Sequence, residues 1–276
     1  MVLGIGWTIN HIFSLFRRCI YVILSVGPIP NHIAFILDGN RRYAKKHKLR
    51  EGAGHNIGFL SLTSMLQCCY ELGVKHVTIY AFSIDNFKRR PEEIRYLMDL
   101  MQEKIEFLPK EENLVNRLGI RVQFFGNLKL LSEGARDSAQ SAMSATATNS
   151  KAFLSICVAY TSTHEIVHAV EQVCKEKKQR KAWNEHVNLD DVERQMYLAN
   201  IPEPDILVRT SGANRLSNFL LWQSAYAHLY SPSALWPEIS FWHLIWMVLN
   251  YQRNYGYLEK QQQNMDHVNV FGRSNP

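Results

Sequence analysis

A single acid stands in a strongly basic segment near the start of the sequence. Asp38 follows an apolar run, residues 32–37. The residues after it are small, amide or basic, namely Gly39, Asn40, Arg41, Arg42, Lys45 and Lys46. A helix beginning near residue 42 would offer free N–H groups to an anion, and arginine side chains would add charge. Asp38 then suits Mg²⁺, which takes carboxylate and phosphate oxygens together, although a helix cap paired with arginine explains it equally well.

Two later segments combine polar and basic side chains in the same way. The first has Ser83, Asp85 and Asn86, followed by three cations, Lys88, Arg89 and Arg90. The second has Arg209, Arg215 and Ser217. Two guanidiniums and a hydroxyl suit a diphosphate, because arginine donates in a planar, bidentate fashion. Taken alone, the first segment is explained as a polar turn before a helix, and the second as arginines that pair with acids across an interface. No P-loop motif occurs, which excludes that nucleotide site.

Alternating strands and helices must position these residues. Short runs rich in β-branched and aromatic residues predict strands at 32–37, 76–81, 120–125, 153–159 and 206–208. Helical periodicity predicts helices at 56–72, 91–118, 132–148, 162–175, 217–226 and 241–260. The pattern indicates a single α/β domain with a mainly parallel central sheet flanked by helices. All three polar segments follow strands, so we expect one cleft at the carboxyl ends, holding two anionic groups and a metal.

Two of these helices have apolar faces that could wall a long cavity, although such faces more often form ordinary core. They are the helices at 56–72 and 91–118, and the apolar residues are Leu60, Leu97, Leu100, Met101, Ile105 and Leu108.

The N-terminal segment, residues 1–28, is apolar but interrupted by Arg17 and Arg18. Its longest uncharged piece, residues 19–26, is too short to cross a bilayer, which requires about 20 apolar residues. We expect an amphipathic helix on a membrane surface or a partner. A helix that packs on its own domain is an equally open alternative. The remaining chain divides into a main domain at 29–260 and a loose polar tail at 261–276.

Composition sets broad limits on the function. The chain has 276 residues, is 46% hydrophobic and carries a formal charge of +6, which suits an anionic ligand or a membrane surface. Its five cysteines include no CxxC pair, and this favours reduced thiols over a disulfide framework or a zinc site.

Four segments in order resemble the signature regions of the cis-prenyltransferases. They are "HIAFILDGNRRYAKK", "YAFSIDNFKR", "RTSGANRLSNFLLWQ" and "LYSPSALWPE". The resemblance runs from about residue 32 to residue 257 and is closest to the plant branch, which includes rubber-type enzymes. It implies sequential cis condensation of isopentenyl diphosphate onto farnesyl diphosphate, with Mg²⁺, to give a long-chain polyprenyl diphosphate of the dehydrodolichyl type or rubber. It also implies a peripheral protein on the cytosolic face of the endoplasmic reticulum.

The resemblance also implies roles for individual residues. Asp38 is the metal-associated acid, and Asn86 and Ser83 lie beside the reacting carbons. The residues implied for the allylic diphosphate are Gly39, Asn40, Arg41, Arg42 and Arg89. His55 is a further substrate-binding residue. The residues implied for isopentenyl diphosphate are Arg209, Arg215 and Ser217.

Several positions depart from the family pattern. Arg41 replaces a glycine of bacterial members, Ala213 replaces an acid, and His228 replaces a glutamate that reaches the metal. A metal here would therefore rest on Asp38, phosphates and water, because neutral imidazole is a poor Mg²⁺ ligand. The arginine expected before the first long helix falls at Glu51. The Arg-x-Gly motif of self-sufficient members is absent from the last residues, which predicts a Nogo-B-receptor-like accessory subunit.

Three other classes of protein are disfavoured. A non-catalytic accessory subunit of the same family would tend to lose Asp38 and the diphosphate arginines, which are retained. The trans-prenyltransferases use DDxxD pairs, whereas the one Asp-Asp pair here, at Asp190, lacks the third acid. A nucleic-acid-binding protein would carry a basic stripe with exposed aromatics rather than charges gathered at strand ends.

Overall fold

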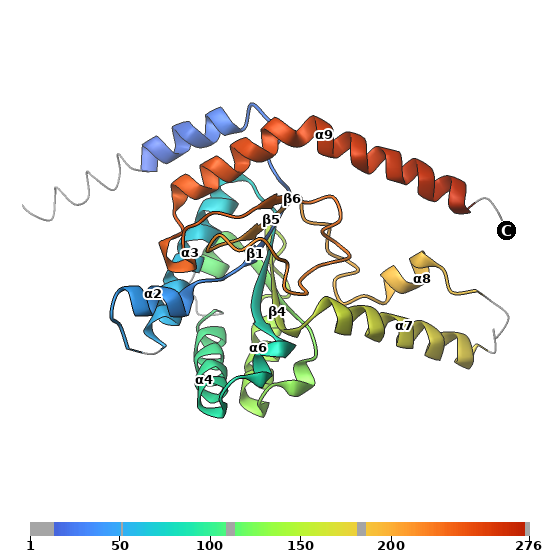
Figure 1. The fold of residues 1–276 in the computed structure, drawn as a ribbon, viewed down its shortest axis with the longest axis horizontal. Coiled ribbons are helices and arrows are strands. Elements are labelled where there is room, and N and C mark those ends of the chain that lie inside the picture. Colours follow the sequence, from blue (N-terminus) through green and yellow to red (C-terminus); the bar gives the residue numbers. More distant parts are fainter. Residues whose placement is uncertain (1–13, 51, 109–113, 181–185, 274–276) are drawn as a thin grey trace, which may run out of the picture.

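A six-stranded parallel sheet forms the centre of the molecule (Figure 1). The computed structural model describes residues 14–50, 52–108, 114–180 and 186–273. The strands are β1 (His32–Ile36), β2 (His76–Ser83), β3 (Ile120–Phe125), β4 (Ala152–Tyr160), β5 (Ile206–Arg209) and β6 (His228–Tyr230). Their order across the sheet is β3-β4-β2-β1-β5-β6, and every neighbouring pair is parallel. The predicted fold class, a mainly parallel sheet flanked by helices, is confirmed.

Burial on both faces explains why the strands could be predicted. In β1, Ile33 and Phe35 join the core on one face of the sheet, and Ala34 and Ile36 join the core on the other. A strand covered on both sides is apolar at every position rather than at alternate positions, so it stands out in the sequence. The five predicted strands end within two residues of the observed ones. The short edge strand β6 is partly exposed and was not predicted.

Helices cover both faces of the sheet. They are α2 (Asn40–Lys46), α3 (Ala53–Leu72), α4 (Pro91–Phe107), α5 (Leu114–Leu118), α6 (Glu133–Ala145), α7 (Ser162–Gln179), α8 (Leu189–Arg194) and α9 (Phe241–Arg273). Three short 3₁₀ helices, η1 (Ile84–Lys88), η2 (Leu128–Leu130) and η3 (Trp236–Glu238), lie in the loops. Helices α3, α4, α6 and α9 share one large core with the sheet, and α7 packs against α8 on the other side (Figure 1).

Two predicted helices differ from the structure. The helix predicted at 91–118 is divided, because α4 ends at Phe107 and α5 begins at Leu114; residues 109–113 lie outside the described part. Pro109 follows this end in the sequence, and it has no backbone N–H with which to continue the helical hydrogen bonds. The helix predicted at 217–226 is wrong, because this segment forms a series of turns. Its apolar residues Phe219 and Leu220 are buried against the sheet instead of lying along one helical face.

The N-terminal helix, residues 14–24, packs on its own domain through one face, which was one of the two alternatives that the sequence left open. Tyr21 and Leu24 are buried, and the Tyr21 ring contacts Phe241 of α9 at 5.7 Å between centroids. Val22 and Ile23 are 67% and 69% exposed. One face therefore packs on the domain while an apolar face remains open. No helix of the described residues is both long and apolar enough to span a membrane. The tail predicted to be loose after Lys260 instead continues α9 to Arg273.

Candidate active site

The three polar segments meet at one edge of the sheet. Strands β2, β1 and β5 are adjacent and parallel, so their carboxyl ends lie side by side. A cavity of about 710 Å³ opens there. Ten of the twelve predicted site residues line it, namely Asp38, Asn40, Arg41, His55, Ser83, Asn86, Arg89, Arg209, Arg215 and Ser217. Gly39 and Arg42 are not among the lining residues.

Asp38 is held between two guanidiniums. Its Oδ2 atom accepts a hydrogen bond from Nη2 of Arg209 at 2.8 Å, and its Oδ1 atom accepts one from Nη2 of Arg42 at 3.2 Å. Thr210 fixes the backbone, because its hydroxyl bonds both the N–H and the carbonyl oxygen of Asp38. Partial burial raises the pKa of the carboxyl, but Arg209 and then Arg42 outweigh that effect and leave the pKa below its ordinary value. Asp38 is therefore ionised at neutral pH.

Arg209 links this acid to the last polar segment. Its side chain is only 8% exposed, and its Nη1 atom donates to the Ser217 hydroxyl at 2.6 Å and to the Arg215 carbonyl oxygen at 2.8 Å. Its buried Nε atom has no hydrogen-bond partner within the described residues. One guanidinium thus connects the end of β1 with the loop that follows β5.

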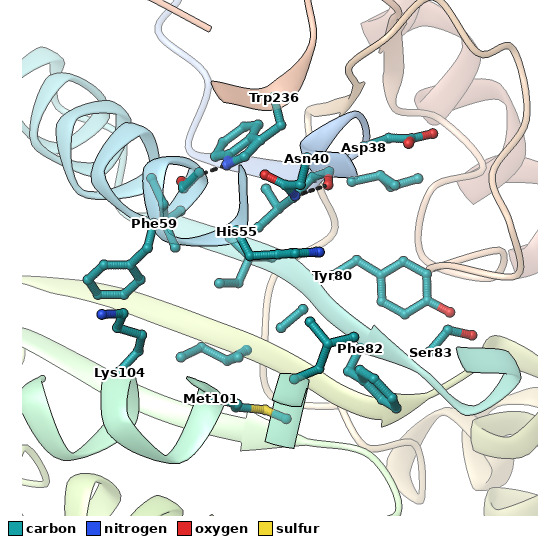
Figure 2. A pocket seen from close by; sticks show the side chains of 18 of the residues that line it. Asp38, Asn40, His55, Phe59, Tyr80, Phe82, Ser83, Met101, Lys104 and Trp236 are labelled. Carbon is teal, nitrogen blue, oxygen red and sulfur yellow. Dashed lines mark hydrogen bonds between the residues drawn. The ribbon is translucent and has the colours of Figure 1, made fainter. Parts of the chain in front are cut away.

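Close packing sets the position of Asn40 at the start of α2. Gly39, with a φ of 115°, allows the chain to turn from β1 into the helix. The Asn40 amide donates to the Leu37 carbonyl at 3.1 Å. Gly58 of α3 leaves room for this side chain, since a Cβ there would lie 2.2 Å from Asn40 Oδ1. In Figure 2 Asn40 lies between Trp236 and His55 at the mouth of the cavity.

Ser83 and Asn86 cap η1 in the structure. The Ser83 hydroxyl accepts a hydrogen bond from the Asp85 N–H at 3.1 Å, and Asn86 Oδ1 accepts one from the Ser83 N–H at 3.1 Å. The alternative of a polar turn before a helix therefore describes their local bonding, although both side chains also line the cavity.

Glu93 is a site residue that the sequence analysis missed. Its Oε1 atom accepts a hydrogen bond from Arg89 at 2.8 Å and another from Arg41 at 3.3 Å. Glu93 therefore pairs with two cations that line the cavity. Its position in the first turn of α4 made it look like an ordinary helix-start acid. His55 lies near the same cations, and burial, then Arg89 and Arg41, lowers its pKa to about 4. The imidazole is therefore neutral at pH 7.

The inner part of the cavity is apolar. Helices α3 and α4 and the sheet supply residues that share an apolar surface, among them Leu62, Leu66, Leu97, Leu100, Met101, Ile105 and Leu108. Leu60, which the sequence placed on this face, is instead 66% exposed. One cation reaches the wall, because Lys104 lies over the Phe59 ring at 5.5 Å from its centroid (Figure 2). The cavity therefore suits an amphiphile with an anionic head and a hydrocarbon chain.

The positions that depart from the family pattern do not supply a metal ligand. His228 pairs in register with Ile206 at the start of β6, whereas Asp38 follows the carboxyl end of β1. Three strand residues, or roughly 10 Å, separate the level of His228 from the end of β1 at Ile36, and Asp38 lies two residues further on. Ala213 carries no ligating group, and Glu51 lies outside the described residues. Over the described ranges, no group of three or more His, Cys, Asp or Glu side chains is placed to hold a metal.

Comparisons with known proteins agree with this geometry. The family model described as putative undecaprenyl diphosphate synthase matches residues 36–257. The chain is 58% identical to a dehydrodolichyl diphosphate synthase of Solanum lycopersicum, over 94% of this chain and 96% of that one. It is 53% identical to a rubber cis-polyprenyltransferase of Hevea brasiliensis, over 90% and 92%. A mouse dehydrodolichyl diphosphate synthase complex subunit is 41% identical, over 92% of this chain and 77% of that one.

A solved structure shares the fold. It is a lavandulyl diphosphate synthase from Lavandula x intermedia in complex with dimethylallyl diphosphate, with a TM-score of 0.74 and 27% identity. The match covers 81% of this chain and 95% of that one. Together these matches confirm the resemblance that the four sequence segments indicate.

The ion pair with Arg209 predicts the titration of Asp38. Because that guanidinium favours the carboxylate, Arg209→Met should raise the pKa of Asp38, and Arg42→Met should raise it less. The carboxyl resonance of Asp38, followed by ¹³C NMR and assigned with Asp38→Asn, measures the change. Because the pKa of Asp38 is lower in the folded than in the unfolded state, its ionisation stabilises the fold at pH values above the unfolded-state pKa. This stabilisation is lost as the pH falls through the folded-state pKa. The difference in unfolding free energy between wild type and Arg209→Met should therefore be largest at neutral pH and should shrink as the pH falls through the folded-state pKa of Asp38.

Arg215→Met is the matched control, since the hydrogen bonds to the Asp38 carboxylate come from Arg209 and Arg42. An equal rise in the pKa of Asp38 in Arg215→Met and Arg209→Met would contradict the assignment of the shift to the Arg209 contact.

Proposed function

The chain belongs to the undecaprenyl diphosphate synthase family, and on that premise we propose that it is a cis-prenyltransferase. It adds isopentenyl diphosphate units to farnesyl diphosphate and releases a long-chain polyprenyl diphosphate of the dehydrodolichyl type. The observation that carries this proposal is the division of one cavity into a cationic mouth and an apolar interior. The mouth suits diphosphates, and the interior suits a growing hydrocarbon chain.

The two groups of cations suit two diphosphates. Arg41 and Arg89 are joined through Glu93, and Arg42 bonds Asp38 directly. We assign this group to the allylic diphosphate. Arg209 bonds Ser217 and the Arg215 carbonyl, and we assign this second group to isopentenyl diphosphate. Fixed guanidiniums facing the diphosphates stabilise negative charge without reorganising, which lowers the barrier to its development.

The reaction is a carbon–carbon bond formation between the two ligands. The allylic C–O bond breaks, and its electron pair leaves with the diphosphate. The isopentenyl double bond attacks the allylic carbon, and a proton is then lost from the isopentenyl unit to form the new double bond. The apolar wall of α3 and α4 excludes water from the allylic cation. Ser83 and Asn86 line the cavity at the end of β2, and we assign them to the reacting end of the isopentenyl unit.

The donor set at Asp38 fits a Mg²⁺ ion bound together with substrate. Mg²⁺ keeps several waters and is commonly bound by one or two carboxylates with substrate phosphates. Asp38 is an ionised carboxylate that lines the cavity, and its side chain is 25% exposed. We assign Asp38, diphosphate oxygens and water as the ligands. When bound, Mg²⁺ would neutralise charge on the leaving diphosphate.

We further propose that the protein lies on the cytosolic face of the endoplasmic reticulum membrane as a peripheral protein. The open face of the N-terminal helix adjoins exposed aromatic residues at the start of α9. The Phe16 ring contacts Trp242 at 6.0 Å between centroids, and Trp242 and Trp246 are 57% and 54% exposed. A helical surface with exposed tryptophan and aliphatic side chains suits the boundary of headgroups and acyl chains. A membrane surface would also receive the apolar product.

An accessory subunit completes the proposal. The mouse relative is named as a subunit of a dehydrodolichyl diphosphate synthase complex, and it matches nearly the whole of this chain. We infer that this chain is the catalytic subunit of a similar heteromer, with a partner of the Nogo-B-receptor type. The retained Asp38 and arginines support a catalytic rather than an accessory role.

Incorporation of radiolabelled isopentenyl diphosphate tests the activity. With farnesyl diphosphate and Mg²⁺, the wild type should form a ladder of polyprenyl products, with a higher rate when the accessory subunit is present. Asp38→Ala should lower the rate about a hundredfold or more, because it removes the carboxylate that organises the diphosphate end. Asp137→Ala removes an exposed acid of α6 and should leave the rate unchanged. Equal rates in wild type and Asp38→Ala would reject the assigned site.

Vesicle flotation tests the membrane surface. The wild type should bind vesicles of phosphatidylcholine with a minority of phosphatidylserine. The double variant Trp242→Ser, Trp246→Ser should bind at least about tenfold more weakly, because two large apolar contacts are lost. Leu189→Ser is the matched control, since Leu189 is 57% exposed on α8 (Figure 1). Unchanged flotation of the tryptophan variant would contradict the proposal.

A further inference from the structure

The loop after β5 adopts backbone conformations that its residues disfavour. Ser211, Ser217, Asn218 and Leu220 have φ values of 75°, 49°, 60° and 47°. For residues with a Cβ these left-handed conformations cost free energy, because the Cβ crowds the following carbonyl. Asparagine tolerates them best among these types, while serine and leucine do not favour them. Such residues persist where the surrounding structure over-determines them, and they gather at functional sites.

The first turn of α7 supplies that restraint through Asn218. The Asn218 carbonyl oxygen accepts hydrogen bonds from the N–H of Ser162 at 2.8 Å and from its hydroxyl at 3.2 Å. Asn218 Oδ1 accepts from the N–H of Thr163 at 3.0 Å and from its hydroxyl at 3.1 Å. The N–H of Leu221 donates to the Ser162 hydroxyl at 2.9 Å. Five hydrogen bonds therefore join the loop to one helical turn.

This turn of α7 is itself anchored in the core. Glu165 is fully buried, and its carboxylate accepts a hydrogen bond from the Tyr160 hydroxyl at 2.5 Å. It also accepts from the N–H of Leu198 at 3.1 Å and from the Gln223 amide at 3.1 Å. Both oxygens of the buried Glu165 carboxylate are paired, and such bonds restrict the chain around them. The first turn of α7 is therefore held in place by the core, and its hydrogen bonds to Asn218 and Leu221 fix the position of the loop.

The same loop also lines the cavity, through Arg215, Ser217 and Asn218. Ser217, the neighbour of Asn218, accepts the hydrogen bond from Arg209 through its hydroxyl. The Tyr80 hydroxyl donates to the Tyr160 carbonyl at 3.0 Å and lies 3.4 Å from the Ser217 carbonyl, and the Tyr80 ring stacks on Phe219 at 4.5 Å between centroids. The residues on either side of Asn218 are thus tied to β2, while Asn218 is tied to α7. A shift of Asn218 would rotate the Ser217 hydroxyl away from Arg209.

We propose that Asn218 is a positioning residue for isopentenyl diphosphate, acting by clamping the strained loop of Arg215 and Ser217 onto the first turn of α7. The inference rests on the proposed function, which assigns that loop to isopentenyl diphosphate. The side-chain oxygen is the essential group, since it accepts both Thr163 bonds. Asn218 acts through Ser217 and Arg209 and not on the reacting carbons.

Substitutions of Asn218 distinguish the effect of losing its side-chain hydrogen bonds from the effect of its backbone conformation. Asn218→Ala and Asn218→Gly both remove the oxygen, but glycine adopts positive φ freely. Asn218→Asp retains the acceptor, and its charge is favoured near the start of α7. In the enzyme assayed together with its accessory subunit, Asn218→Ala and Asn218→Gly should each raise the KM for isopentenyl diphosphate about tenfold. The KM for farnesyl diphosphate should stay within about threefold, and Asp should restore both values to within about threefold.

Asn188→Ala is the matched control for a purely structural effect. Asn188 caps α8 with a side-chain hydrogen bond to the Asp191 N–H at 2.8 Å, so its loss costs stability away from the cavity. It should change neither KM. A wild-type KM in Asn218→Gly would overturn the clamp, because backbone conformation alone would then suffice. Equal increases of both KM values in Asn218→Ala would also overturn it, since they would indicate general damage.

A binding measurement keeps this inference distinct from the proposed function. Calorimetric titration with inorganic diphosphate reports on the cationic mouth without turnover. Weaker diphosphate binding in Asn218→Ala that is restored in Asn218→Asp supports the clamp. If this pattern of binding is found but the wild type forms no product ladder, the proposed function fails and the clamp stands. A product ladder in the wild type with unchanged KM and unchanged diphosphate binding in Asn218→Ala would reject the clamp alone.

Discussion

The carboxylate of Asp38 has a guanidinium on each oxygen, and the rest of the site is arranged around that contact. Arg209 reaches it from the end of β5, and Arg42 reaches it from α2. Because β1 and β5 are paired in register, the sheet itself fixes the distance between the acid and Arg209. The same guanidinium then holds the loop of Ser217. Both terminal nitrogens of the buried Arg209 guanidinium form hydrogen bonds, so this side chain links Asp38 after β1 to the Ser217 loop after β5.

The cavity changes character along its length, and that change follows from the architecture. Parallel strands bring polar residues together at their carboxyl ends, while α3 and α4 present apolar faces above the sheet. The mouth therefore suits a charged group, and the interior suits a hydrocarbon chain attached to it. Glu93 pairs with both Arg41 and Arg89, which limits the repulsion between these two cations.

Much of this site could be predicted from the sequence because it lies at strand ends. Buried strands are continuous apolar runs, so the residues directly after them, such as Asp38, Asn86 and Arg209, could be placed at one edge of a sheet. The loop at 217–226 could not be predicted, since its left-handed residues depend on hydrogen bonds to α7, more than fifty residues earlier in the chain. Glu93 was missed for a similar reason, because its partner Arg41 lies on another helix. Local patterns do not contain such long-range contacts.

The central claim is that Asp38 holds Mg²⁺ together with a diphosphate. Calorimetric titration with farnesyl diphosphate, with and without Mg²⁺, tests it most directly when wild type is compared with Asp38→Asn. Asparagine keeps the shape but removes the charge, so the guanidiniums remain and the carboxylate ligand is lost. The account predicts that Mg²⁺ strengthens binding to the wild type about tenfold or more and has little effect on the variant. Equal strengthening in both proteins would contradict it.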